Sequence, residues 1–380
     1  MSEQMLDRVA QLVQSARRLA EDRVRPQAAR WQAERSMGLD VLREGAQLGL
    51  TGMQVPVELG GLGLPFSCKS HVGAALAEAD FGFSLSLINT AGVAATLALS
   101  LPPTVAQRWL PQLLSGERIG CTALTEASAG SDFGAIQMLA TPHGSGWRLH
   151  GEKRWIINAQ VADVMVVYAQ TQPGAGPKGI AAFVVDGTRP GFKRSDQGHT
   201  ETLASLGTGG FVLDGYEVQG DEVLAAPGAA FKRAMQSINY ARIYVAAMAA
   251  AMVRDSLRIA LQYGQKRKTF GMYLPMHQSW RWTLTDAFID LEAAQLMIDR
   301  ANAASDSGQA LEGVAAQAKV FATRMACKHL GPLQHALGAA GLSPDLALSR
   351  HVAAAQVATL VDGSTEMLME RIAMKYASGA

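Results

Sequence analysis

The stretch VMVVYAQTQPGAGPKGIAAFVV, residues 164–185, indicates the class of fold more directly than any other part of the chain. Two β-prone apolar runs, Val164–Ala169 and Ile180–Val185, flank a turn cluster rich in glycine and proline. Within that cluster, GAGPKG (174–179) formally matches the GxGxxG pattern of dinucleotide-binding folds. That fingerprint requires a helix after it, whereas here a β-prone run follows and Pro177 interrupts the motif. We therefore predict a hairpin loop at the surface.

The regions on either side of this hairpin have a different pattern. Before it, apolar residues recur at helical spacing, and long helical patterns return after about residue 230. Further β-prone runs, Trp147–His150 and Phe211–Val218, lie between these regions. An α–β–α order without repeated βαβ units is inconsistent with a doubly wound sheet. The sequence predicts an α+β fold with an N-terminal helical domain (1–117), a small central β domain (118–228) and a C-terminal helical domain (229–380).

The composition excludes several classes of protein. Lys and Arg number 34 and Asp and Glu number 33, so the net charge is +1. A nearly neutral chain is a poor candidate for nonspecific nucleic-acid binding or for polybasic attachment to a membrane. The three cysteines lie far apart and the eight histidines show no metal-ligand spacing, so we predict neither disulfides nor a metal site. The first residues contain no apolar signal region, and a cytoplasmic location is predicted.

One uncharged stretch, Phe81–Leu101, is long enough to span a bilayer. It also contains serines, threonine, asparagine and two glycines. This polarity is typical of a helix buried in a protein core, which is what we expect here.

Two local features could hold a cofactor. In TEASAGSD (125–132), small and hydroxyl residues follow an apolar run. Such a loop can hold a phosphate or the polar edge of a heterocycle with its backbone N–H groups, although an ordinary turn explains it equally well. In RWIIN (154–158), Trp155 could pack in a core or stack on a planar cofactor.

Several separated motifs, agreeing in order and spacing, resemble the acyl-CoA dehydrogenase family of flavoproteins along almost the whole chain. They are PVELGGLG (56–63), CTALTEASAGSD (121–132), RWIIN (154–158), RKTFG with HQ (267–271 and 277–278), QHALGAAG (334–341) and DGSTE (362–366). The resemblance implies that family's fold: an N-terminal α-helical domain, a β-sandwich or barrel-like middle domain and a C-terminal four-helix bundle. It also implies FAD as cofactor and a homotetramer.

The resemblance implies roles for individual residues. Asp362 falls at the position of the catalytic glutamate, the base that removes the α-proton of an acyl thioester while a hydride passes to FAD. The residues implied to bind FAD, some of them the FAD of a neighbouring subunit, are Leu124, Thr125, Gly130, Ser131, Trp155, Ile156, Ile157, Arg267, Thr269, Phe270, His277, Gln278, Gln334, Gly338, Ser364 and Glu366. Those implied to bind the substrate are Ser131, Asn239, Arg242 and Gly363.

The implied substrate is an acyl-CoA or an acyl group on a carrier protein, and the implied electron acceptor is an electron-transfer flavoprotein. The sequence departs from the family pattern at two functional positions. Asp362 is one methylene shorter than glutamate, and capping a helix is an alternative role for it. Ile157 stands where most members have a hydroxyl residue that bonds flavin N5. The alternatives are therefore a flavin oxidase or monooxygenase that uses dioxygen, resembling nitroalkane oxidase, and a catalytically degenerate flavin-fold protein.

Overall fold

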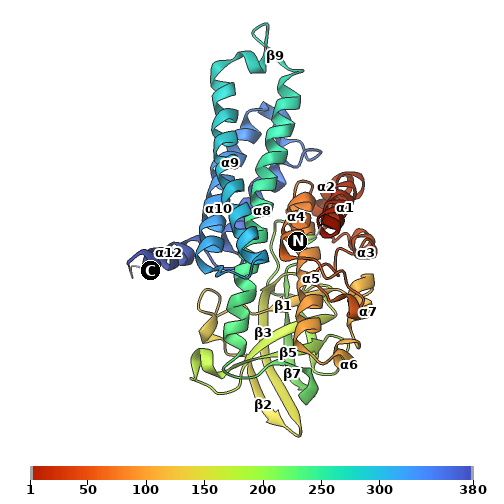
Figure 1. The fold of residues 1–380 in the computed structure, drawn as a ribbon. Helices are drawn as coiled ribbons and strands as arrows, with labels where there is room; N and C mark the ends of the chain where they lie inside the picture. Colours follow the sequence, from red (N-terminus) through yellow and green to blue (C-terminus); the bar gives the residue numbers. More distant parts are fainter. Residues whose placement is uncertain (1–2, 378–380) are drawn as a thin grey trace. The chain divides into compact units, whose positions relative to one another are not determined.

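The computed structural model describes residues 3–377 and confirms the predicted order of helices, sheet and helices (Figure 1). The chain forms two compact units. We call residues 3–12, 35–65 and 85–237 the β unit, and residues 13–34, 66–84 and 238–377 the helical unit. Each unit therefore draws on separate stretches of sequence.

The helices are α1 (Glu3–Leu19), α2 (Arg25–Glu34), α3 (Leu39–Gln47), α4 (Phe66–Ala77), α5 (Phe81–Ser100), α6 (Pro103–Ala106), α7 (Leu110–Ser115), α8 (Ala230–Gly264), α9 (Gln278–Asp306), α10 (Glu312–His335), α11 (Leu348–Leu360) and α12 (Thr365–Ala377). The strands are β1 (Gly120–Ala123), β2 (Leu139–His143), β3 (Gly146–Ile156), β4 (Val164–Gln170), β5 (Ile180–Asp186), β6 (Phe192–Ser195), β7 (Gly209–Val218), β8 (Val223–Ala225), β9 (Lys268–Thr269) and β10 (Met272–Tyr273). A π-helical turn, Ala20–Val24, joins α1 to α2.

The β unit is built on an eight-stranded sheet with the strand order β6-β7-β3-β2-β4-β5-β8, and β1 pairs in parallel with β4. In β4, Val164, Val166 and Tyr168 pack into an apolar cluster that includes residues of α5 and α7. The alternate residues Met165 and Val167 pack into a second cluster on the other face. Because side chains alternate between the faces of a strand, a strand covered on both faces is apolar at every position. This explains the continuous apolar runs of β4 and β5.

The predicted hairpin is confirmed. Strands β4 and β5 pair antiparallel from Val164↔Asp186 to Gln170↔Ile180, and the GAGPKG segment lies in the loop that joins them. Gly174 and Gly176 have φ values of +80° and +58°, which glycine adopts without steric cost. Gly174 and Gly176 therefore allow the backbone to turn between β4 and β5.

In the helical unit, α10 packs against α9, α11 and α12, and Arg254 of α8 donates to Gln295 of α9 at 2.7 Å. Ala316 and Val320 of α10 form an apolar cluster with Leu368 of α12, and Ile372 packs on it. The β9–β10 hairpin closes the turn between α8 and α9, at the end of this unit remote from α12 (Figure 1).

Among the described residues, α5 is the one helix long and apolar enough to cross a membrane. Of its most apolar window, 72% is buried inside the protein. Core helices also meet these criteria of length and composition, so α5 is weak evidence for a span and fits the expected buried helix.

Candidate functional site

A buried ion pair holds the start of the predicted FAD loop in the β unit. Lys153 of β3 has a fully buried side chain, and its Nζ donates to Glu126 Oε1 and to the Leu124 carbonyl, each at 2.8 Å. Glu126 also accepts the backbone N–H groups of Gln137 and Met138 at 2.6 and 3.0 Å. Burial lowers the pKa of Lys153 to about 8, and Glu126 opposes that shift. Three separate segments are therefore tied together at Glu126.

The RWIIN segment forms a tight turn beside this loop. The Arg154 N–H donates to the Thr125 carbonyl at 3.2 Å, which joins the two predicted FAD segments. Trp155 and Asn158 have φ values of +54° and +67°, a conformation that costs energy outside glycine. The buried Asn158 amide donates to the Ser86 and Gly120 carbonyls, each at 2.9 Å. This network holds the turn, and it leaves Trp155 49% exposed.

The residues at this turn fit a flavin. A half-exposed indole held by a strained backbone is available to cover a planar ring system. Thr208 is buried beside the same turn, and its hydroxyl has no hydrogen-bond partner among the described residues. Gln160, just after the RWIIN turn, connects this turn to the Thr208 loop, since its side-chain amide donates to the Thr208 carbonyl at 2.9 Å. A buried hydroxyl without a partner is a donor that the polar edge of a ligand could satisfy.

The other predicted FAD residues of the β unit differ in exposure. Gly130 and Ser131 are exposed on the loop after Glu126, and Ile157 is partly exposed. Ile156 packs into the core and is 3% exposed, so only its backbone is available to a ligand.

Most of the remaining predicted FAD residues lie together at one end of the helical unit, whereas Ser364 and Glu366 lie at the start of α12, beside the turn between α11 and α12. Trp280 Nε1 of α9 donates to the Ala336 carbonyl at 3.1 Å, which joins the segment after the β9–β10 hairpin to the turn after α10. The residues brought to this end are Arg267, Thr269, Phe270, His277, Gln278, Gln334 and Gly338. Phe270 is 97% exposed with φ +50°. Gln334 Nε2 is occupied by the Gly341 carbonyl and Ser349 Oγ, at 3.1 and 2.7 Å.

Asp362 lies in the turn between α11 and α12 of the helical unit. Its φ is +57° and that of Gly363 is +103°. Arg242 Nε donates to the Asp362 carbonyl at 3.0 Å, and Arg242 Nη1 donates to Asn239 Oδ1 at 2.6 Å. The Lys319 ammonium donates to the Gly363 carbonyl and, at 3.4 Å, to the Thr359 carbonyl. The predicted residues Asp362, Gly363, Arg242 and Asn239 are thus brought together.

The carboxylate of Asp362 is left free by this arrangement. It has no hydrogen bond and no ion pair within 4.0 Å among residues 3–377, because Arg242 and Lys319 bind the backbone of the turn instead. Its oxygens are not among the fully enclosed unpartnered atoms, so they keep access to solvent. Burial raises the pKa of Asp362 above its ordinary value, and the positive charges of Lys319, Arg242 and Lys69 oppose the rise. A carboxylate of this kind can accept a proton from a ligand.

Helix capping was the alternative role predicted for Asp362, but Ser364 caps α12 instead. The Met367 N–H donates to Ser364 Oγ at 3.4 Å at the start of α12, and hydrogen bonds from the Glu366 backbone N–H and from Ser364 lower the pKa of Glu366. Ser364 and Glu366 thus satisfy the first turn of the helix. The Asp362 side chain makes no capping bond in the described structure.

Sequence reasoning missed Lys69, Lys319 and Thr208. The two lysines are 6% and 0% exposed and lie on α4 and α10, far from Asp362 in sequence. A lysine inside an apolar helical pattern is the signal that could have identified them, because unpaired lysine is rarely buried. Thr208 lies in a glycine-rich loop and has no comparable signal.

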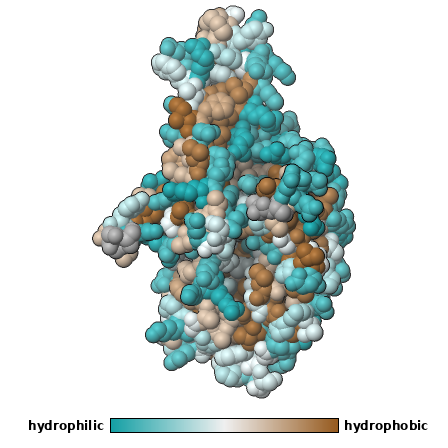
Figure 2. All heavy atoms as spheres, in the orientation of Figure 1, coloured by the Kyte–Doolittle hydropathy of each residue, from teal (hydrophilic) through white to brown (hydrophobic). Residues whose placement is uncertain are grey.

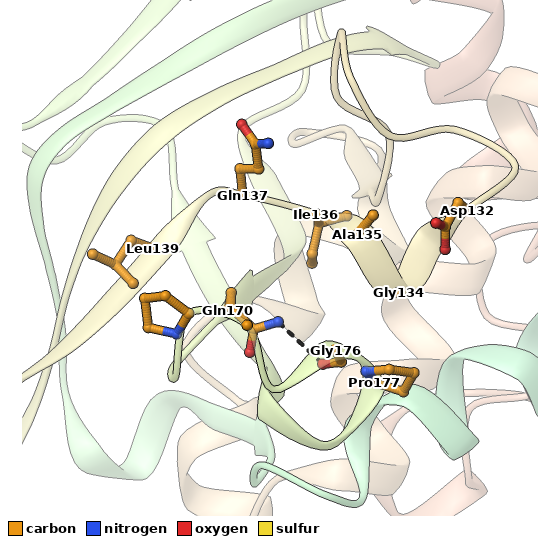
Figure 3. Close-up of a pocket in the computed structure, with 11 residues that line it drawn as sticks. Asp132, Gly134, Ala135, Ile136, Gln137, Leu139, Gln170, Gly176 and Pro177 are labelled. Carbon is orange, nitrogen blue, oxygen red and sulfur yellow. Dashed lines mark hydrogen bonds between the residues drawn. The ribbon is translucent and has the colours of Figure 1, made fainter.

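A surface hollow of about 540 Å³ lies next to the predicted FAD loop in the β unit (Figure 3). It is lined by Asp132, Gly134, Ala135, Ile136, Gln137, Leu139, Gln170, Pro173, Gly174, Gly176 and Pro177. Gln170 points into the loop and donates to the Gly176 carbonyl at 3.1 Å. None of the lining residues is basic, so a phosphate would find no counter-charge there.

Comparisons with known proteins agree with the predicted resemblance. Family models described as the N-terminal, middle and C-terminal domains of acyl-CoA dehydrogenase match residues 7–117, 121–216 and 228–377. The chain is 30% identical to the mitochondrial short-chain specific acyl-CoA dehydrogenase of Bos taurus, over 94% of this chain and 87% of that protein.

Solved structures extend the match to the whole fold. Butyryl-CoA dehydrogenase from Megasphaera elsdenii is 25% identical, with a TM-score of 0.93 over 99% of both chains. PigA with FAD and proline is 25% identical, with a TM-score of 0.92 over 100% of this chain and 99% of that one. The cofactor predicted from the sequence, FAD, is thus present in a protein of the same fold. The chain is an oxidoreductase that belongs to the acyl-CoA dehydrogenase family.

Proposed function

We propose that this protein is an FAD-dependent dehydrogenase of an acyl thioester, with Asp362 as the base that removes the α-proton. The observation that carries the proposal is the arrangement at the α11–α12 turn. Arg242 and Lys319 bind the backbone carbonyls of Asp362 and Gly363, while the carboxylate itself has no partner. A base must be positioned firmly and must also be free to accept a proton, and this turn meets both conditions.

The residues of this chain would act as follows. The Asp362 carboxylate takes the proton from the α-carbon, and its raised pKa makes it a stronger base than an ordinary aspartate. Arg242, Lys319 and Lys69 keep the surroundings positive and so favour the enolate-like charge that develops on the thioester. Bound FAD supplies the acceptor for the β-hydrogen, which leaves as a hydride.

The backbone of the α11–α12 turn determines where the short Asp362 side chain begins. Aspartate reaches about 1.5 Å less than glutamate, the length of one C–C bond. A Cβ added at Gly363 would lie 3.4 Å from Arg242 Nη2, at a φ that other residues rarely adopt. Glycine at this position therefore allows the turn to lie close to Arg242.

The FAD would be held by residues of two subunits. Thr125, Ser131 and Trp155 would bind it from the β unit, and Arg267, Gln278 and Gln334 would reach the FAD of a neighbouring subunit. Within the helical unit, the β9–β10 hairpin lies at the end remote from α12 (Figure 1). This position is consistent with binding the FAD of a neighbouring subunit. The substrate would be an acyl-CoA or a carrier-protein thioester, with an electron-transfer flavoprotein as acceptor in the cytoplasm.

The test is anaerobic reduction of the bound flavin. The purified protein is expected to carry about one FAD per chain and to lose its flavin absorbance on addition of suitable acyl-CoA esters, in the absence of dioxygen. Chromatography of the extracted chromophore identifies FAD. FMN as the bound flavin, or no bleaching with any acyl-CoA of a broad panel, would contradict the proposal.

A second reaction is favoured by Ile157, because isoleucine has no hydroxyl to bond flavin N5. If the enzyme is an oxidase or monooxygenase, the reduced protein will reoxidise rapidly in air without an added protein acceptor. Slow reoxidation in air together with rapid oxidation by an electron-transfer flavoprotein supports the dehydrogenase.

The protein is expected to form an oligomer, a tetramer, that retains FAD only when assembled. Exposed apolar side chains gather on the hairpin and on α9, where Figure 2 shows brown and tan patches over the helices. They are Phe270, Met272, Tyr273, Met276, Trp282, Phe288, Ile289 and Leu296. Such patches mark interaction surfaces. Light scattering with simultaneous flavin absorbance measures both properties, and a stable FAD-saturated monomer would refute the prediction.

A further inference from the structure

Lys69 is a buried ammonium group without a hydrogen-bond acceptor. The residue is 6% exposed and lies on α4, where its Nζ is 5.3 Å from the centre of the Tyr244 ring. No acceptor is within hydrogen-bond distance of this Nζ, and no carboxylate within 4.0 Å, in residues 3–377. A largely desolvated ammonium without a polar partner is costly, and a cation–π contact offsets only part of that cost.

Arg242 and Lys319, the other two cations near Asp362, already have hydrogen-bond acceptors. Arg242 donates to Asn239 and to the Asp362 carbonyl, and Lys319 donates to two backbone carbonyls. Within residues 3–377, Asp362 is the single carboxylate whose charge acts on Lys69. Two further carboxylates act on the others from exposed positions, Glu312 on Arg242 and Glu366 on Lys319. Three buried cations thus act on one partly buried carboxylate, and Lys69 is the one that lacks an acceptor.

Tyr244 adds a second free polar group at the same place. It is 9% exposed, and no hydrogen bond of its hydroxyl is present in the described residues. Neither Lys69 Nζ nor the Tyr244 hydroxyl is among the fully enclosed unpartnered atoms, so both keep access to solvent. One helical turn away, Phe66 packs against Tyr240 with ring centres 4.8 Å apart, which fixes α4 against α8. The Lys69 ammonium and the Tyr244 ring are therefore held near each other by two helices that pack together.

We infer that Lys69 and Tyr244 bind a carboxylate at the far end of the substrate's acyl chain, so that the enzyme acts on dicarboxylic acyl thioesters. This inference rests on the proposed function, because Asp362 places the α-carbon of the substrate within this cluster. A group that binds near Asp362 belongs to the acyl chain and not to the distant nucleotide. The two oxygens of a carboxylate match one ammonium and one hydroxyl donor.

The same pair would reject an ordinary fatty acyl chain. A terminal methyl group gives the ammonium no acceptor and would keep water from it, so the desolvation cost of Lys69 would remain. A carboxylate instead forms a charge-assisted hydrogen bond. Hydrogen bonds to charged groups contribute enough for a preference of about 10- to 100-fold between chains of equal length.

The experiment compares acyl-CoA esters matched in carbon number: succinyl with butanoyl, glutaryl with pentanoyl, and adipyl with hexanoyl. The ratio of kcat/KM for flavin reduction, dicarboxylic over monocarboxylic, is measured for the wild type, Lys69→Met, Lys69→Arg and Tyr244→Phe. We expect the wild-type ratio for the best pair to exceed about 10, and Lys69→Met to lower it about 10- to 100-fold. Lys69→Arg should restore part of it, and Tyr244→Phe should lose a smaller part. Lys193→Met, an exposed lysine of β6, is the matched control and should keep the wild-type ratio.

A binding measurement separates this inference from the proposed function. Calorimetry with the unreactive thioethers S-(3-carboxypropyl)-CoA and S-butyl-CoA reports the same preference without any chemistry. If no ester bleaches the flavin but the thioether preference depends on Lys69, the proposed reaction fails and the carboxylate site stands. If butanoyl, pentanoyl and hexanoyl esters bleach the flavin as efficiently as their dicarboxylic partners, the site is wrong and the proposed reaction stands. A ratio unchanged in Lys69→Met also overturns the site, and Lys69→Arg keeps the test valid should the methionine variant not fold.

Discussion

Asp362→Asn is expected to slow flavin reduction by the preferred acyl-CoA at least ~10²-fold, the usual loss when a general base is removed. Asparagine keeps the shape of the side chain and cannot accept the proton. Because the Asp362 carboxylate bonds to no other described side chain, its replacement should leave the turn intact. Arg242 and Lys319 bind only the backbone there. Stopped-flow absorbance under anaerobic conditions measures the rate.

Three further measurements show whether the loss comes from the base. FAD content and the Kd of an unreactive CoA thioether should stay close to the wild-type values. The wild-type reductive rate should rise with pH as Asp362 loses its proton, with an inflection above the ordinary aspartate pKa of about 4, because burial raises this pKa. Asp362→Glu restores a base with a longer reach and should retain activity on slimmer substrates. Near wild-type reduction by Asp362→Asn would show that another group is the base.

Lys153→Met is expected to lower the free energy of unfolding by about 3–5 kcal/mol, the usual cost of removing one partner of a buried ion pair. Methionine fills a similar volume, but it leaves the Glu126 carboxylate buried without its counter-charge. The Leu124 carbonyl also loses its donor. Since these residues begin the predicted FAD loop, FAD should dissociate more readily as well. Urea unfolding followed by circular dichroism gives the stability, and ultrafiltration gives the FAD retained.

The double variant Lys153→Met with Glu126→Gln separates charge from packing. It removes both charges, so it should recover part of the stability lost in Lys153→Met. Glu217→Gln serves as control, since this exposed β7 residue pairs with Arg148 at the surface and should change stability by less than about 1 kcal/mol. If Lys153→Met is as stable as the wild type, the ion pair does not stabilise the loop.

Local patterns were sufficient to predict much of the architecture. The apolar runs of β4 and β5, the turn residues between them and the absence of a following helix predicted the hairpin and excluded a dinucleotide-binding fold. The change from apolar residues at helical spacing to short β-prone runs, and back again, predicted the order of helices and sheet. These features depend on neighbouring residues, so they can be read from one stretch of sequence.

The role of Asp362 was predicted from the resemblance of DGSTE (362–366) to a motif of the family, and the sequence alone left helix capping as an alternative role. The cap requires a particular side-chain geometry, and the structure assigns it to Ser364, two residues further on. Spacing alone does not show which of several polar residues bonds the first turn of a helix.

By itself, the sequence of this protein determined the fold, the family and the residue type at the position of the proposed base, because each of these is encoded in short motifs and in their order along the chain. The tertiary structure alone decided the electrostatic surroundings of Asp362. Lys69, Arg242 and Lys319 come from three helices, and no local pattern records that they act on one carboxylate. Electrostatic interaction depends on distance and burial, which appear only when those helices are packed together.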